Sequence, residues 1–233
     1  MAYSYSTWTA ALTSAAVTDA TDAGFTAILP SVIDYAEQRI YRDLDLLSTI
    51  VRDESAVVTA NHRDFVLPSS GGRFVEVKAV NIVTPIGSTV ANGTRNPLTL
   101  TSLEYIDFTW PSEIASSVTA IPIWFAMVTD QSIVMAPSPG AAFSIEVIGN
   151  VRPTPLSATN TTTFLASYLP DLFFAASMIF VSGWQKNFGA QADDPRMAMS
   201  WETQYQSLLA SAKTEELRKK YAASFGSAPA KTG

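Results

Sequence analysis

The sequence of 233 residues contains no cysteine and only one histidine, His62. The absence of thiols excludes disulfide scaffolds, cysteine-ligated zinc or iron–sulfur sites, and thiol nucleophiles. One imidazole is too few for most metal sites and for most general-base arrangements. His62 lies at the tip of a predicted hairpin with Asp64 as its one carboxylate nearby in sequence, so we interpret it as an exposed turn residue. We therefore expect no enzyme activity, no cofactor and no metal ion.

Charged residues are also scarce, at 15% of the chain against 47% hydrophobic residues. Because an ordinary soluble domain carries about 25% charged residues, this surface must be rich in Ser, Thr, Ala and exposed apolar groups. Such a surface is often covered by a partner, which disfavours a lone monomer. The formal net charge of −6 argues against a surface that grips the nucleic-acid backbone.

Long apolar runs are missing as well. The longest, Leu172 to Val181, is interrupted by Ser177 and is far shorter than the ~18 residues of a membrane helix. The first residues, Met-Ala-Tyr-Ser-Tyr-Ser, lack a basic segment and an apolar stretch, so no signal peptide is expected. We therefore predict no membrane partner.

Helical periodicity dominates the beginning of the chain. Residues 5–17 predict one helix, and a stronger pattern begins at Thr21 or Asp22. Pro30 is expected to start or kink this second helix. Its apolar stripe comprises Phe25, Leu29, Ile33, Ala36, Ile40, Leu44 and Leu47. Its predicted polar face comprises Asp34, Glu37, Gln38, Arg39, Arg42, Asp43 and Asp45.

Two more helices are predicted towards the other end. Residues 170–188 are apolar nearly all round, which indicates a central buried helix. Residues 193–221 predict a long helix with a narrower stripe, and residues 226–233 form a polar tail without a core pattern. The stripe of the long helix comprises Met197, Trp201, Tyr205, Leu208, Leu209 and Ala212.

Between these helices the hydrophobic period changes from 3.6 to 2, which predicts about seven short strands separated by turn residues. The predicted strands are 55–60, 63–67, 73–83, 97–101, 122–128, 132–135 and 141–151, with a short helical turn at 102–108. The fold class is therefore α+β: a bundle of N- and C-terminal helices with an inserted antiparallel β-sandwich or barrel-like domain. The expected segments are 1–52 and 159–222 for the bundle, 53–158 for the β domain, and 223–233 for a flexible tail.

Positive charge is concentrated at the C-terminal end of this acidic chain. Lys213, Arg218, Lys219, Lys220 and Lys231 all lie in its final segment. Two interpretations remain open. One is a solvated helix end; the other is a segment that docks on an acidic partner with Tyr221 and Phe225 as apolar anchors.

Tryptophan is the residue type that most invites a binding role. Trp184 and Trp201 lie on helical stripes, where core packing explains them. No Lys or Arg interleaves with the tryptophans, as a single-stranded nucleic-acid platform would require. Trp110, before Pro111, is either a loop anchor or a contact with another subunit.

Two segments carry a resemblance to a known family. Leu29 to Leu44, with the sequence LPSVIDYAEQRIYRDL, resembles the leading helix of head-to-tail adaptor (connector) proteins of tailed bacteriophages, of the podovirus-type tail tubular or portal-adaptor family. Tyr168 to Leu172, with the sequence YLPDL, resembles the start of the later apolar helix in these proteins. Members also share the helix–sheet–helix order and lack catalytic machinery.

The resemblance implies a structural virion protein of the neck or tail, present in the host cytoplasm during assembly. It implies a dodecameric ring that joins the capsid portal to the tail nozzle and lines the channel through which DNA passes without specific binding. Trp110 is then a candidate contact with a neighbouring subunit or the tail. The C-terminal helix end and tail would bind the portal through Lys213, Arg218, Lys219, Lys220, Tyr221, Phe225 and Lys231.

A different class of protein fits the same layout. The β domain could be a carbohydrate- or receptor-binding sandwich of a virion or surface protein, with the helices as an attachment stalk. Trp110 and Trp124 would then be exposed and would stack on sugars.

Overall fold

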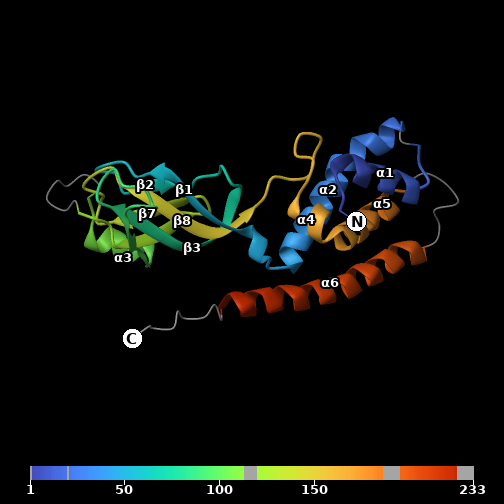
Figure 1. The fold of residues 1–233 in the computed structure, drawn as a ribbon. Helices are drawn as coiled ribbons and strands as arrows, with labels where there is room; N and C mark the ends of the chain where they lie inside the picture. Colours follow the sequence, from blue (N-terminus) through green and yellow to red (C-terminus); the bar gives the residue numbers. More distant parts are fainter. Residues whose placement is uncertain (1, 20, 113–119, 186–194, 225–233) are drawn as a thin grey trace. The chain divides into compact units, whose positions relative to one another are not determined.

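The computed structural model describes residues 2–19, 21–112, 120–185 and 195–224 (Figure 1). The chain divides into two compact units, which are described separately. The helical unit comprises residues 1–48 and 154–233, and the β unit comprises residues 49–153. Helices thus flank a middle segment of mostly antiparallel strands, and the predicted α+β fold class is confirmed.

The helical unit begins with two capped helices. Ser4 and Asp22 each stand one residue before a helix, and the Asp22 carboxylate accepts the Phe25 N–H at 2.8 Å, which satisfies a donor that the first turn leaves free. A short 3₁₀ turn, Leu47–Thr49, lies at the boundary with the β unit. The described helices of this unit are α1 (Tyr5–Ala15), α2 (Ala23–Asp43), α4 (Phe164–Tyr168), α5 (Pro170–Gln185) and α6 (Pro195–Ser224).

Helix α5 forms the centre of the helical unit. It packs against α1, α2, α4 and α6, and Phe173, Ala176 and Val181 are fully buried. Trp8 of α1 stacks on Phe173 with 5.5 Å between ring centroids. The prediction of a central buried helix is therefore confirmed over residues 170–185, whereas its last predicted residues, 186–188, lie outside the described part of the chain.

Helix α2 differs from its prediction in two respects, the position of Pro30 and the residue at which the helix ends. Pro30 lies inside the helix and does not start it; Phe25 and Leu29, both buried, anchor the turn before Pro30 although proline cannot donate a helical hydrogen bond. The helix ends at Asp43, because Leu44 adopts an extended conformation. The five-residue helix α4 was not predicted, since its short segment shows no helical period.

Two sheets make up the β unit. The first has the strand order β1-β8-β3-β4 and the second β2-β7-β6-β5. All described pairings between these strands are antiparallel except β5–β6, which is parallel over two residues. The elements are β1 (Ile50–Val57), β2 (Asp64–Val66), β3 (Arg73–Thr84), β4 (Thr94–Pro97), β5 (Thr99–Leu100), α3 (Leu103–Thr109), β6 (Trp124–Thr129), β7 (Ser132–Ala136) and β8 (Ser144–Arg152).

The hydrophobic core of the β unit contains side chains from both sheets. Ile145, Val147 and Val151 of β8 join Phe125 and Ile133 of the second sheet in one cluster of buried side chains. The period of 2 that predicted a strand over residues 141–151 thus corresponds to alternate residues of β8 that face the core. Helix α3, foreseen as a helical turn, begins after its cap Ser102.

The predicted strand 97–101 is wrong as a single strand. Its residues divide between β4, which belongs to the first sheet, and β5, which belongs to the second. Leu98 lies between them, is buried, and donates its N–H to the Val80 carbonyl at 2.9 Å. A chain that passes from one sheet to the other keeps an apolar, strand-like pattern, so sequence period alone does not detect the crossing.

Candidate functional site

The C-terminal end of α6 carries most of the basic residues predicted to bind a partner, and two of them are held within the helical unit. Lys219 Nζ lies 2.7 Å from Glu215 Oε1 and 2.8 Å from Glu216 Oε1. The hydrogen bonds that Lys219 donates to these two carboxylates raise its pKa. Lys220 forms an ion pair with Asp45, just beyond the end of α2. Lys220 therefore attaches α6 to the segment after α2, whereas Lys219 is paired within α6 and lies 5.9 Å from the Phe164 ring centroid of α4. Both charges are paired and contribute little free charge.

A neighbouring face of the same helix end is exposed. Lys213, Leu217 and Tyr221 follow one another at intervals of four, which places them on one helix face, and all three are exposed. Lys213 and Arg218 form no ion pair or hydrogen bond with any described residue. We call Lys213, Leu217, Arg218 and Tyr221 the outer stripe of α6. Leu217 was not singled out from the sequence, although its spacing from Lys213 and Tyr221 was a usable signal.

Two residues predicted to act with this group, Phe225 and Lys231, lie outside the described residues. The structure describes the other five predicted residues, which fall into two groups. Lys219 and Lys220 are partly buried and paired with carboxylates, whereas Lys213, Arg218 and Tyr221 are exposed.

A polar network joins the middle of α6 to α2. Arg39 Nη2 donates to Glu202 Oε1 at 2.6 Å, and the guanidinium lies 4.3 Å from the centroid of the Tyr205 ring. The Tyr205 hydroxyl, on a fully buried residue, donates to Asp43 Oδ2 at 2.7 Å. Burial and the neighbouring carboxylate of Asp43 raise the pKa of Tyr205. Polar contacts of Arg39 and Asp43 thus hold α6 against α2 in addition to apolar packing.

Two buried glutamates hold the segments where the chain leaves and re-enters the helical unit. Glu216 Oε2 accepts the Leu47 N–H at 3.0 Å, and Glu37 Oε1 accepts the Leu156 N–H at 3.1 Å. Burial raises the pKa of Glu37 to about 7, with a smaller contribution from the charge of Asp34. The prediction that Glu37 lies on a solvent-facing polar surface is therefore wrong; it is 3% exposed because the returning chain at Leu156 covers it.

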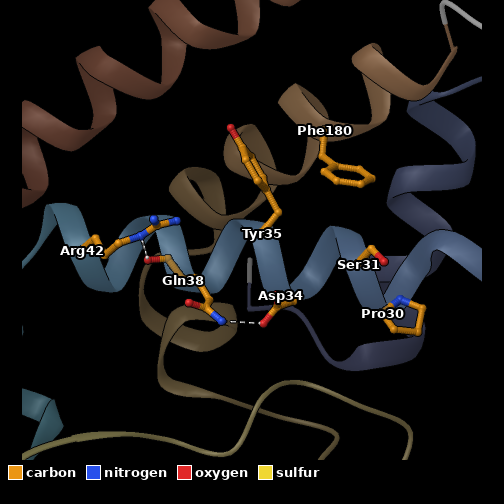
Figure 2. A pocket seen from close by; sticks show the side chains of 7 residues that line it. All are labelled: Pro30, Ser31, Asp34, Tyr35, Gln38, Arg42 and Phe180. Atoms are coloured by element: carbon orange, nitrogen blue, oxygen red, sulfur yellow. Dashed lines mark hydrogen bonds between the residues drawn. The ribbon is translucent and has the colours of Figure 1, made fainter. Parts of the chain in front are cut away.

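A shallow groove of about 590 Å³ lies along α2 and receives Phe180 from α5 (Figure 2). Its polar side chains bond to one another along α2: Gln38 donates to Asp34 at 2.9 Å, and Arg42 donates to the Gln38 carbonyl at 3.1 Å. Figure 2 shows no nucleophile paired with a base among these residues. The lining residues are Pro30, Ser31, Asp34, Tyr35, Gln38, Arg42 and Phe180. The groove thus combines polar side chains of α2 with the rings of Tyr35 and Phe180.

In the β unit, Trp110 follows α3 and is half-buried. The ring of Tyr105 packs edge-on against Trp110 at 6.1 Å and against Trp124 at 5.9 Å between centroids. Both tryptophans pack on the small apolar cluster around Ile106. The exposed tryptophans that a sugar-binding site needs are therefore not observed. Beside them Phe108 is 88% exposed, and sequence reasoning missed it.

The described residues contain no group of three or more His, Asp or Glu side chains that could hold a metal ion. His62 is exposed in its turn, as predicted. None of the described helices combines the length and hydropathy needed to cross a membrane. The described residues present three candidate contact surfaces: an anchored helix with an exposed stripe, a shallow groove and an aromatic corner.

The protein is thus a two-unit α+β chain in which helices flank a β-sandwich. The chain belongs to the SU10 adaptor protein family, whose family model matches residues 6–229. It is therefore a structural adaptor protein of a bacteriophage and a component of the virion, and this family is not a class of enzymes. No curated protein matches the chain.

Proposed function

We propose that this adaptor is of the podovirus type and forms a dodecameric ring that joins the capsid portal to the tail nozzle. DNA would pass through the ring during genome ejection without specific binding. The family supports an adaptor role, and the acidic composition supports a channel that does not retain DNA. In a closed ring each subunit must offer two different surfaces to its neighbours, and the groove of α2 and α5 and the aromatic corner at Trp110 and Phe108 are suitable surfaces.

The proposal for portal binding rests on the outer stripe of α6. Leu217 and Tyr221 are large apolar side chains, 67% and 66% exposed, flanked by the unpaired cations Lys213 and Arg218. Apolar anchors with adjacent Arg or Lys are typical of contact residues in protein interfaces. Phe225 and Lys231, further along the chain, would extend this contact. Lys220 would support it indirectly, because its ion pair with Asp45 holds the helix end in place, and Lys219 would add a charge paired within α6.

The test is assembly with the portal protein of the same phage, measured by sedimentation. Wild-type chain should bind the portal as a ring. Leu217→Asp should weaken this binding at least tenfold, since it places a charge in a desolvated contact worth more than about 1.4 kcal/mol. Met199→Asp is the matched control, because Met199 is equally exposed near the other end of α6.

Equal binding by Leu217→Asp and by the control would overturn the assignment of the stripe. A truncation before Lys213 is a less suitable test, since it also removes Glu216, which holds the Leu47 backbone. Loss of binding by that truncation would confuse a lost contact with a loosened unit.

A further inference from the structure

One ionised cluster in the β unit has no role in the contacts described above. Glu146 lies on β8 between Ile145 and Val147, which point into the core, so its side chain points to the outward face of the first sheet. Although it is on an outward face, Glu146 is 0% exposed. Its carboxylate is covered by side chains from the neighbouring strands.

Each of the other three strands of this sheet contributes one of those side chains. Asn81 of β3 donates to Glu146 Oε2 at 2.6 Å. Arg95 of β4 approaches Oε2 through its Nε at 3.1 Å, and Arg52 of β1 approaches Oε1 through its Nε at 3.2 Å. A buried carboxylate needs such partners, since an unpaired one would be strongly destabilising.

The two arginines bind Glu146 with Nε and leave their terminal nitrogens unused. No described residue forms a hydrogen bond or an ion pair with the Nη atoms of Arg52 or Arg95. The two side chains remain 55% and 41% exposed. Arg95 Nε also lies 3.2 Å from Oε1, so both guanidiniums contact the same oxygen and are close to each other. Two guanidiniums are thus held in position with donors available to solvent, which lowers the entropic cost of binding an anion.

The charge of the cluster indicates what kind of anion it fits. One arginine would neutralise Glu146, and the second leaves an excess of a single positive charge. One further carboxylate would neutralise the cluster and complete an alternating arrangement of two guanidiniums and two carboxylates. A nucleic acid is disfavoured, because residues 49–153 contain six Lys or Arg against nine Asp or Glu and offer no extended basic track.

We propose that Arg52 and Arg95 form a carboxylate-binding site on the outward face of the first sheet, which receives an Asp or Glu side chain of a protein partner. Glu146 and Asn81 are its positioning residues. The site is separate from the outer stripe of α6 and does not depend on the proposed ring. It gives the β unit a specific polar contact in addition to its apolar aromatic corner.

The experiment uses the full chain labelled with ¹⁵N and a hexaglutamate peptide as the probe. The Nε–H resonances of Arg52 and Arg95 should shift together on titration, whereas hexaglutamine should leave them unchanged. Arg52→Gln and Arg95→Gln should each raise the dissociation constant about fivefold or more, because each removes one charged fork. Arg73→Gln is the charge-matched control, since Arg73 is exposed on β3 and pairs with Asp130.

Arg52→Lys and Arg95→Lys control for a folding defect. They keep a positive charge next to Glu146 but lose the forked donors of the guanidinium. They should be folded and should still bind more weakly than wild type. Absence of shifts with hexaglutamate, or equal weakening by Arg73→Gln, would overturn the proposal. So would tighter binding of an oligothymidylate at the same two resonances, which would identify a nucleic-acid site.

Discussion

Helices α5 and α6 lie side by side in the helical unit but are held by different forces. Helix α5 is surrounded by apolar side chains, and residues such as Phe173 and Ala176 are completely buried. Helix α6 buries a narrow stripe, which is supplemented by hydrogen bonds that Glu202 accepts from Arg39 and Glu216 accepts from the Leu47 N–H. The comparison teaches that α5 stabilises the unit through its buried surface, while polar contacts hold α6 with one face exposed.

The largest effect should come from the core of α5. Phe173→Ala removes a fully buried ring that stacks on Trp8, and we expect a loss of about 3–5 kcal/mol in the free energy of unfolding. Phe180→Ala, on the same helix but in the open groove of Figure 2, should cost less than half as much. Urea denaturation of both variants measures the difference. Equal losses would contradict the central role assigned to Phe173.

The polar contacts of the helical unit should respond to pH, unlike the α5 core. Glu37 has a pKa of about 7 in the folded chain against an ordinary value of 4.5, so the folded state binds its proton more tightly. Its stabilising contribution is complete below about pH 4.5 and is lost as pH rises to about 7, a change of up to about 3 kcal/mol. Glu37→Gln should therefore be more stable than wild type at pH 8 and similar at pH 4.5.

The measurement is the unfolding free energy of both proteins from pH 4.5 to 8. Glu54→Gln serves as the control, because Glu54 is an exposed carboxylate on β1. A Glu37→Gln variant that keeps the wild-type slope would show that Glu37 does not cause it.

The anchoring of α6 through Glu216 should be worth less than a core aromatic ring. Glu216→Ala leaves the Leu47 N–H without its acceptor, which should cost about 1–3 kcal/mol. Amide exchange at Leu47 should accelerate in parallel. Glu215→Ala removes an exposed partner of the same Lys219 and should change stability by about 0.5 kcal/mol or less. If the two alanine variants behaved alike, burial of Glu216 would have no special consequence.

The smallest effects concern the basic residues at the end of α6. Lys220→Ala breaks a partly exposed ion pair with Asp45 and should cost about 0.5 kcal/mol. Lys213→Ala and Arg218→Ala should leave thermal stability unchanged, since these side chains form no ion pair or hydrogen bond with a described residue. A clear destabilisation by Lys213→Ala would show that the outer stripe is part of the folded unit.

The sequence predicted what depends on local period and composition. The stripe of α2, the buried character of α5 and the inward face of β8 each repeat within a few residues, so their patterns were sufficient. The burial of Glu37 and Glu216 could not be predicted, because each contacts a backbone amide more than a hundred residues away. The same holds for Glu146, whose partners Arg52 and Arg95 come from separate strands.

For the candidate site at the end of α6, the sequence indicated which residue types are present but not how they are arranged in space. The charge count placed Lys213 and Lys219 in one basic group. In the structure they lie on different faces of α6, and of the two only Lys219 is paired with described residues, Glu215 and Glu216. Trp110 was chosen from the sequence as a candidate contact, yet the most exposed ring near it is Phe108. The exposed fraction of a side chain depends on which other segments cover it in the fold, so residue type alone does not determine it.

Site-specific photo-crosslinking tests the central claim most directly. A photoreactive residue would replace Leu217 on the outer stripe or, as a control, Met199 near the other end of α6, and each protein would be mixed with the portal protein of the same phage. The account predicts crosslinks to the portal from position 217 and few from position 199. Crosslinks from 199 in the absence of any from 217 would contradict it.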